Sequence, residues 1–466
     1  MIINVAGAGA GKTTNLASRV TGETIDPNKV IYVVAFTNSA VDKISEKIRF
    51  LNGGSIPKNI IVSTIHSFLY REFVYPFYYI LYEKHFSKIS AISLPEKPEF
   101  RQKKLGDLEK DLTLHLKVIP QKAKWVVYGK TGDCKEIKNK RKKILYFFSQ
   151  YCQKIYIDEA QDIDDDMMCI FKSLDDVGIN VEMFGDPKQD IKGYGCFRLL
   201  INDNKSPDYI IESHRCPSKH LLLSNILAPE PEKQFASKDN ENGDISVYFE
   251  SDYGSIEEIV NCKTFGLIYI QKKNDRILTR DERQRNNLFD SVEFEIHKAV
   301  DKKYIGILTE KDVNRLSYSI ADHLILENKA GNDVIALLKE MITKNCLDYD
   351  KVLWARMHEL FDVDTKTNQG SKYVVVRSIE SVKGLEDKEC LFILNRELAP
   401  YLFDSSLQDE NKNKHLLYVA LTRSLNNLSI LILKEVEELY QKSQIISFFK
   451  TLLGNGLIIG QSLGQA

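Results

Sequence analysis

Short apolar runs separated by polar, helix-compatible segments recur along both halves of the chain. In the first half they cover residues 2–6, 30–36, 60–63, 154–157 and 181–184, and in the second half residues 265–270, 373–376, 391–394 and 428–433. Runs of this kind are typical of buried strands. Between them, apolar residues recur at helical spacing, as Val41, Ile44 and Ile48 do. The alternation predicts an α/β fold with parallel sheets, whose ligands bind at the carboxyl ends of the strands.

Two segments interrupt this alternation and are predicted to be mainly helical insertions. Residues 71–150 gather aromatics near their start and carry a basic run from Lys135 to Lys143, while residues 275–370 are charged and helix-patterned. The basic run fits either a solvated helix face or a surface that binds phosphates. We therefore expect a first α/β domain (1–70 and 151–204), a second (205–274 and 371–454), the two insertions, and a flexible tail at 455–466.

Composition narrows the class of protein. The 466 residues carry a formal net charge of -1, so binding of nucleic acid must come from local patches. The eight cysteines form no Cys-x-x-Cys pair, which argues against a zinc ribbon and against a secreted disulfide framework. No apolar run reaches the roughly 20 residues of a membrane-spanning helix, and the first residues lack a signal pattern. We expect a reducing, cytoplasmic location.

The first apolar run leads into a glycine-rich segment, Gly7-Ala8-Gly9-Ala10-Gly11-Lys12-Thr13-Thr14. Small residues let the backbone wrap a phosphate, and the following helix adds its positive end. In such a P-loop, Lys12 reaches the β- and γ-phosphates of ATP and the Thr13 hydroxyl holds Mg²⁺. The usual first glycine is Ala6 here. The alternative, a plain Gly/Ala-rich turn, is disfavoured by the Gly-Lys-Thr ending and by acidic partners later in the chain.

Acidic and polar residues follow two later strands. Asp158 and Glu159 end the run at 154–157; Asp158 is predicted to bind Mg²⁺, and Glu159 to accept a proton from the water that attacks the γ-phosphate. Gln189 follows the run at 181–184 and is predicted to sense the γ-phosphate. Tyr194 either stacks on a DNA base or on the nucleotide, or packs within its Gly-rich loop.

Further blocks follow one another in a fixed order: Phe36-Thr37-Asn38, Thr64-Ile65-His66-Ser67, Asp158-Glu159-Ala160-Gln161-Asp162, Gly185-Asp186-Pro187-Lys188-Gln189, Arg215, Val382-Lys383-Gly384-Leu385-Glu386 and Tyr418-Val419-Ala420-Leu421-Thr422-Arg423. With the P-loop, these blocks make the chain resemble the UvrD/Rep/PcrA-type superfamily 1 DNA helicases everywhere except in the two insertions. The resemblance implies two RecA-like P-loop domains, ATP between them, single-stranded DNA across the top, and 3′-to-5′ movement.

The resemblance also implies roles for single residues. Arg215 and Arg423 are implied to reach the γ-phosphate as arginine fingers, and Glu386 to contact the ribose. His214 stands where the family has a tyrosine that stacks on the base. Contacts to single-stranded DNA are implied for Phe36, Thr37, Asn38, Thr64 and His66. Judged from the residues alone, Thr37 and Thr64 fit a helix cap equally well.

Some features depart from the family pattern. The usual glutamine-bearing segment that reads adenine does not precede the P-loop, the family's Asn-Tyr is Ser213-His214, and its histidine ahead of the Lys-Gly-Leu-Glu segment is Glu380. The second insertion is short, so strand separation by this chain alone is a weaker expectation than ATP hydrolysis.

Compact forms of this kind resemble the helicase subunits of the Gabija anti-phage system, which act with an ATP-dependent nuclease. Two functions are consistent with the sequence. One is an ATP- and Mg²⁺-dependent single-stranded DNA translocase or helicase in anti-phage defence or DNA repair. The other is a DNA-end-sensing ATPase subunit of a nuclease complex that does not itself unwind duplex.

Overall fold

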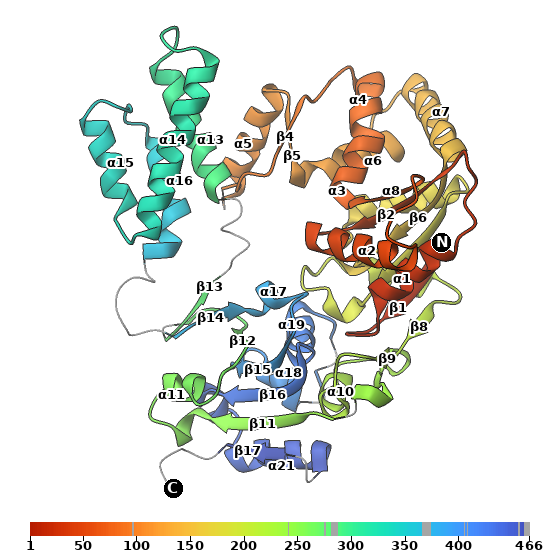
Figure 1. Cartoon of the computed structure of the whole chain (residues 1–466), viewed down its shortest axis with the longest axis vertical. Coiled ribbons are helices and arrows are strands. Elements are labelled where there is room, and N and C mark those ends of the chain that lie inside the picture. Colours follow the sequence, from red (N-terminus) through yellow and green to blue (C-terminus); the bar gives the residue numbers. More distant parts are fainter. Residues whose placement is uncertain are drawn as a thin grey trace. The chain divides into compact units, whose positions relative to one another are not determined.

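The computed structural model describes residues 1–95, 97–240, 242–274, 276–280, 288–365, 374–404, 406–407, 409–454 and 457–460. The chain forms two compact units (Figure 1). The first comprises Met1–His85, Lys117–Gln271 and Arg377–Ala466, and the second comprises Phe86–Leu116 and Lys272–Val376. Both predicted sheets belong mainly to the first unit, which therefore holds the predicted site.

The first sheet has the strand order β3-β2-β6-β7-β1-β8, and all its neighbouring strands run parallel. Its strands are β1 (Ile2–Ala6), β2 (Val30–Ala35), β3 (Ile60–Thr64), β6 (Cys152–Ile157), β7 (Asn180–Gly185) and β8 (Asp208–Ile210). Because parallel strands end at one edge, the P-loop after β1 and the acids after β6 leave the same edge, with β7 between them.

The helices of this part are α1 (Lys12–Gly22), α2 (Asn38–Leu51), α3 (Ile65–Leu69), α4 (Tyr75–Tyr82), α6 (Ile119–Val127), α7 (Lys135–Tyr151), α8 (Asp165–Asp176) and α9 (Cys196–Asp203). Helices α1 and α2 bury Leu16, Ile44 and Ile48 in one apolar cluster with residues of β2 and β6. This packing fixes the first turn of α1 at the edge of the sheet.

The second sheet has the order β13-β14-β12-β15-β16-β11-β17. Its strands are β11 (Asp244–Phe249), β12 (Leu267–Ile270), β13 (Ile277–Arg280), β14 (Val374–Ser378), β15 (Asp387–Leu394), β16 (Ser424–Ile432) and β17 (Leu457–Ile459). The pairings of β11, β12, β15 and β16 with their neighbours are parallel. A short pair, β9 (Glu212–Ser213) and β10 (Phe235–Ala236), lies outside both sheets.

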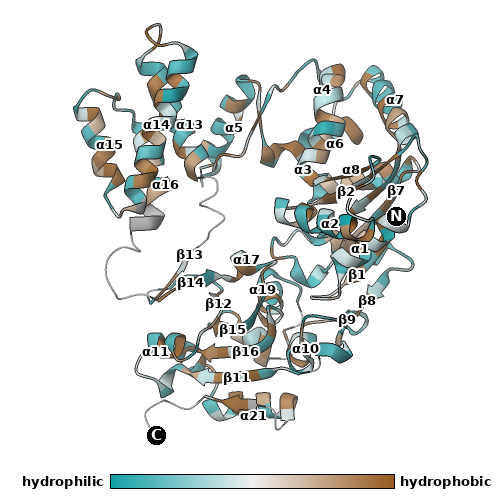
Figure 2. Cartoon of the chain, in the orientation of Figure 1, coloured by the Kyte–Doolittle hydropathy of each residue, from teal (hydrophilic) through white to brown (hydrophobic). Residues whose placement is uncertain are grey.

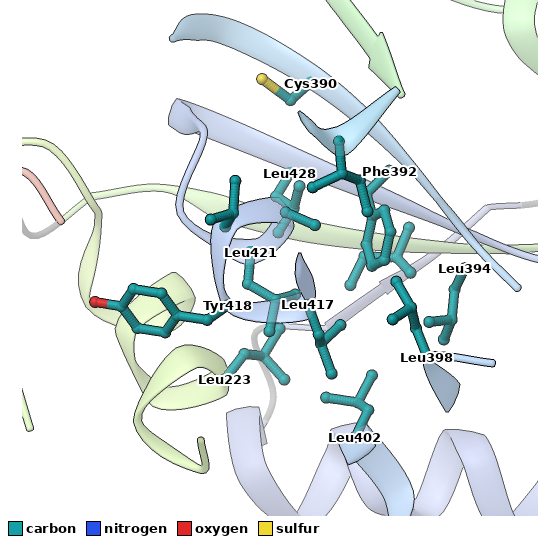
Figure 3. Close-up of a cluster of buried hydrophobic side chains, with 14 of the residues drawn as sticks. Leu223, Cys390, Phe392, Leu394, Leu398, Leu402, Leu417, Tyr418, Leu421 and Leu428 are labelled. Carbon is teal, nitrogen blue, oxygen red and sulfur yellow. The ribbon is translucent and has the colours of Figure 1, made fainter. Parts of the chain in front are cut away.

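The helices of this second half are α10 (Ser218–Asn225), α11 (Ile256–Asn261), α17 (Ile379–Val382), α18 (Ala399–Phe403), α19 (Lys412–Leu421), α20 (Lys434–Glu437) and α21 (Lys442–Leu453). Figure 2 shows that β11, β15 and β16 are largely hydrophobic. Leu417 and Leu421 of α19 pack against Phe392 and Leu394 of β15, as Figure 3 shows. This cluster anchors α19, the helix that precedes Arg423.

The second compact unit is built from β4 (Lys88–Ser90), β5 (Thr113–His115), α5 (Pro98–Lys110), α13 (Leu288–Lys303), α14 (Glu310–Lys329), α15 (Val334–Thr343) and α16 (Lys351–Thr365). Its core contains Val292, Ile296, Leu338 and Met357. A largely buried ion pair, Lys104 Nζ to Glu295 Oε1 at 2.6 Å, joins α5 of the first insertion to α13 of the second. Residues 86–116 of the first insertion thus belong to the same compact unit as the second insertion.

The fold class predicted from the sequence, α/β with two parallel sheets and mainly helical insertions, is confirmed. Strand β11 was not predicted, although it pairs with both β16 and β17. Within the segment expected to be a flexible tail, residues 457–459 instead form β17, because Leu457, Ile458 and Ile459 complete the ladder of β11. Residues 455, 456 and 461–466 lie outside the described part of the chain.

The finer division into domains stays a prediction. No helix within the described ranges is both long enough and apolar enough to cross a membrane.

Candidate nucleotide and DNA site

The P-loop occupies the turn between β1 and α1, where the sequence predicted it. Gly9 and Gly11 both have φ of 69°, a left-handed conformation that glycine adopts without a steric penalty. The Lys12 ammonium donates to the carbonyls of Ala6 at 3.3 Å and Gly7 at 3.5 Å. Residues 7–14 therefore form a tight loop and the first turn of α1, as a phosphate cradle requires.

The predicted Mg²⁺ ligands lie side by side. Asp158 follows β6, and its backbone N–H donates to the carbonyl of Val34 at 2.9 Å, which fixes the residue at the edge of the sheet. The Thr13 hydroxyl donates to Asp158 Oδ2 at 3.2 Å. Hydroxyl and carboxylate oxygens are the hard ligands that Mg²⁺ prefers, so this pair fits the ion. Burial, followed by the charge of Glu159, raises the pKa of Asp158 to about 7.

Glu159, the predicted base, adopts a left-handed backbone conformation with φ of 56°, which is uncommon for a residue with a side chain. Gln161 Nε2 donates to its carboxylate at 2.5 Å. Burial alone would raise the pKa of Glu159, but the charges of Lys12 and Lys383 and this hydrogen bond lower it overall. The carboxylate is thus ionised at neutral pH and able to accept a proton.

Gln189 lies beside the acids in a buried polar network. Its Nε2 donates to Asp186 Oδ2 at 2.9 Å, and the Asp186 N–H donates to Gln161 Oε1 at 3.0 Å. The buried ammonium of Lys188 contacts Asp186 at 2.9 Å and Glu232 at 3.1 Å. Gln189 is therefore connected by hydrogen bonds through Asp186 and Gln161 to Glu159, the predicted base.

The second half reaches the P-loop through residues 213–215. The backbone N–H of His214 donates to the Gly9 carbonyl at 2.9 Å, while its imidazole is exposed. A Cβ on Gly9 would lie 2.3 Å from Arg215 Cβ, so only glycine fits there. Arg215 Nη2 pairs with Glu386 Oε2 at 2.5 Å. The predicted finger Arg215, the predicted ribose contact Glu386 and the P-loop are therefore neighbours.

Arg423 is buried, with 1% of its surface exposed. Its guanidinium donates to the carbonyls of Val419 at 2.9 Å and Leu385 at 3.4 Å, and to the Thr422 hydroxyl at 3.1 Å. Among the described residues, no carboxylate pairs with it. Burial, followed by the charge of Arg215, lowers its pKa. A buried cation beside another cation marks a place that favours an anion.

A separate cluster holds the residues predicted to contact DNA. The Lys192 ammonium lies 5.1 Å from the ring centroid of Phe36 and 5.7 Å from that of Tyr194. Tyr194 is 46% exposed, and Lys192 also lowers the pKa of the half-buried His66. Two aromatic rings around a cation provide both a stacking platform and a phosphate contact.

The two threonines of this region both cap helices. Thr37 Oγ1 accepts from Ala40 N at 3.2 Å at the start of α2, and Thr64 Oγ1 accepts from Ser67 N at 3.3 Å at the start of α3. The helix-cap alternative that the sequence left open is thus present in the structure. A cap uses the oxygen as acceptor, so the hydroxyl proton is not consumed by it. Asn38 is exposed as the first residue of α2.

The sequence analysis missed three residues of the site. Lys192 lies between Gln189 and Tyr194, and a cation in that Gly-rich loop was a signal that could have identified it. The Lys383 ammonium bonds Asp162 at 2.8 and 2.9 Å, linking two recognised blocks whose pairing no sequence pattern indicates. Gln234, which contacts the P-loop, lies in no recognised block.

Three comparisons with known proteins show what the chain is similar to. A family model described as an AAA domain matches residues 1–194. Gabija protein GajB of Bacillus cereus (strain VD045) is 23% identical over 482 residues, covering 92% of each chain. A solved structure of the arterivirus nonstructural protein 10 helicase with DNA has a TM-score of 0.37 and 11% identity. That alignment covers 96% of this chain and 63% of that one.

The fold and the P-loop geometry are those of a P-loop ATPase domain, and residues 1–194 match the AAA-domain model. The resemblance drawn from the motifs is confirmed at this level: the chain is similar to an AAA domain over residues 1–194 and is distantly related to Gabija protein GajB.

The environment of His66 generates a prediction about pH. Burial, followed by the charge of Lys192, lowers the pKa of His66 to about 4. Because the unfolded chain then binds more protons than the folded chain between about pH 6.5 and 4, this group reduces stability as the pH falls through that window. We expect an NMR titration to give a midpoint near 4 for His66. In Lys192→Gln the midpoint should rise yet stay below 6.5, since burial is the larger cause. A midpoint near 6.5 in the wild-type protein would show that His66 is solvated.

Proposed function

We propose that this chain is an ATP-driven translocase on single-stranded DNA, with ATP bound between the two sheets. The supporting observation is the environment of Arg423: its buried guanidinium pairs with no carboxylate of the described residues, and it lies beside Arg215, next to blocks that contact the P-loop. Such an arrangement is costly in the absence of an anion and becomes favourable once a phosphate arrives.

The proposed roles divide between the two sheets. From the first, Lys12 and the loop amides hold the phosphates, and Thr13 and Asp158 hold Mg²⁺, which would stabilise the charge that develops on the phosphates. Glu159 accepts the proton of the attacking water, and Gln189 reports the γ-phosphate through Asp186. From the second, Arg215 and Arg423 stabilise the charge that spreads over the γ-phosphate, and Glu386 and His214 contact the nucleoside.

Arg215 must exchange its partner during this cycle. Its pair with Glu386 is partly exposed, with 24% and 43% of the two side chains accessible, and exposed pairs are held weakly. Release of Glu386 to the ribose frees Arg215 for phosphate. Binding of the nucleotide thereby activates the finger.

The DNA is proposed to run over Phe36, Lys192 and Tyr194, at the edge where Thr37, Asn38, Thr64 and His66 also lie. Cycles of closing and opening between the sheets move the strand, in the 3′-to-5′ direction that the family resemblance implies. Opening of a duplex with a 3′ overhang separates this proposal from the alternative, an ATPase that senses DNA ends without unwinding. We further propose that the chain acts in anti-phage defence with a partner nuclease, as the resemblance to Gabija helicase subunits implies; the 23% identity to Gabija protein GajB is consistent with this role.

Two substitutions in the nucleotide site should fail in different ways. Lys12→Ala removes the cation that holds the phosphates, so both ATP binding and hydrolysis should be lost. Glu159→Gln keeps the shape and removes only the base, so ATP should bind with a Kd within a fewfold of wild type while kcat falls at least a hundredfold. Nucleotide Kd by calorimetry and kcat by phosphate release measure both.

Thermal unfolding midpoints control for damage to the fold. Normal turnover in a folded Lys12→Ala variant would refute the P-loop assignment. Loss of nucleotide binding in Glu159→Gln would make Glu159 a structural residue.

The proposed path of the DNA over Phe36, Lys192 and Tyr194 leads to a second prediction. Phe36→Ala removes one stacking platform, and stacking on an aromatic ring contributes about 1–3 kcal/mol per base. The DNA concentration that half-maximally stimulates ATP hydrolysis should therefore rise about tenfold or more, whereas hydrolysis without DNA should stay within twofold of wild type.

Phe50→Ala is the matched control, because Phe50 is 86% exposed at the far end of α2 and belongs to no predicted site. Equal loss of basal and stimulated hydrolysis in Phe36→Ala would indicate damage to the core rather than loss of a DNA contact.

A further inference from the structure

The backbone of the P-loop at Ala8 is held by side chains from the second half of the chain. The Ala8 carbonyl accepts from Ser213 Oγ at 2.9 Å and from Gln234 Nε2 at 3.1 Å. The Ala8 N–H donates to the Tyr418 hydroxyl at 3.3 Å. The two side chains are themselves joined, because the Tyr418 hydroxyl donates to Gln234 Oε1 at 3.0 Å. One peptide of the loop thus has both its polar groups bound from outside the first sheet.

These contacts are buried and rigidly supported. Ala8, Tyr418 and Gln234 have 0%, 1% and 6% of their surfaces exposed. Asn225 anchors Gln234 by two hydrogen bonds, donating to its carbonyl at 2.8 Å and accepting from its N–H at 2.9 Å. A Cβ on Gly7 would lie 2.1 Å from Gln234 Cδ, so the loop and this side chain are closely fitted.

Tyr418 connects the loop to the core of the second sheet. Its ring extends from the apolar cluster around Leu417 and Leu421, and its hydroxyl oxygen lies at the end away from the leucines (Figure 3). Burial raises the pKa of Tyr418, so the hydroxyl stays protonated and can donate to Gln234. Five residues further along the chain is Arg423, whose Nε bonds the carbonyl of Val419 in the same helix. Helix α19 therefore carries a contact to the loop and, through the carbonyl of Val419, also holds the proposed finger, which follows the helix.

We propose that Ser213, Gln234 and Tyr418 form a loop clamp, a set of positioning residues that fix the Ala8 peptide and hold the P-loop in register with Arg423. None of its hydrogen bonds uses an amide N–H between Gly9 and Thr13, or the Lys12 ammonium, so the clamp does not compete with phosphates for these groups. The clamp therefore acts on the alignment of the γ-phosphate with the second half rather than on nucleotide affinity. This inference rests on the proposed ATPase for its kinetic consequence.

Tyr418→Phe and Gln234→Met test the clamp, because each keeps the volume of the side chain and removes its hydrogen bonds. We expect kcat for ATP to fall about tenfold in each, as one or two net hydrogen bonds predict, while the Kd for MgADP stays within about threefold of wild type. Since the two residues share one bond and each also has its own bond to Ala8, the double variant should lose more than either single variant but less than the product of the two losses; a loss equal to that product would show that they act independently and overturn the clamp.

Amide hydrogen exchange measures the opening of the P-loop backbone and does not depend on ATP hydrolysis. Exchange of a peptide covering residues 2–16 should be at least fivefold faster in both variants. Tyr269→Phe is the matched control: that buried tyrosine donates to the Ala420 carbonyl at 2.7 Å in the same helix and has no contact with the loop. It should leave both exchange and kcat within twofold of wild type.

The results separate the two hypotheses. If wild-type protein hydrolyses no ATP, the proposed function is wrong, and the exchange data alone then show whether the clamp holds the P-loop. If exchange in both variants equals that of wild type, the clamp does not hold the loop. Faster exchange with unchanged kcat would show that it holds the loop without positioning it for catalysis, and this too would overturn the proposal.

Discussion

The buried guanidinium of Arg423 is the feature on which the account of this protein depends. Moving a charged group out of water costs several kcal/mol even after relaxation of the surroundings, and neutral carbonyls offset only part of that cost. In this protein the carbonyls of Val419 and Leu385 hold the group, and Arg215 adds repulsion. A structure that keeps a cation in such a place is arranged for an anion that arrives later, and a phosphate beside the P-loop fits that description.

The rest of the architecture brings the loop and this arginine together. Parallel strands deliver the P-loop, Asp158 and Gln189 to one edge of the first sheet, and residues 213–215 extend that edge into the second half. The apolar cluster around Leu417 fixes α19, and through it Tyr418 and Arg423. Lys383 and Asp162 add an ion pair between a block of each half. At the loop, hydrogen bonds from the second half accompany one apolar contact, because Ala8 belongs to the apolar cluster around Leu417.

The sequence predicted the parts of the site that follow local rules. A glycine-rich turn between a strand and Lys12-Thr13, and adjacent acids after a buried strand, are local patterns, so the pair of Thr13 and Asp158 was predicted. Strand β11 was not predicted because Ser246 interrupts its apolar residues. It is recognised as a strand only from its pairing with β16 and β17. Gln234 escaped for a related reason: its role depends on a tertiary contact with Ala8. The contact between the two insertions through Lys104 and Glu295 is likewise a long-range property.

Whether the second half completes the ATPase site can be tested by measuring kcat and nucleotide Kd for Arg423→Ala, Arg423→Lys and wild type. Unfolding midpoints recorded on the same preparations exclude damage to the core. If Arg423 is an arginine finger, kcat of Arg423→Ala should fall roughly a thousandfold or more, as with other arginine fingers, and Kd should change much less. Arg423→Lys should recover little, because a point charge does not reproduce the planar guanidinium fork. A kcat within a fewfold of wild type in folded Arg423→Ala would show that the second half does not complete the ATPase site.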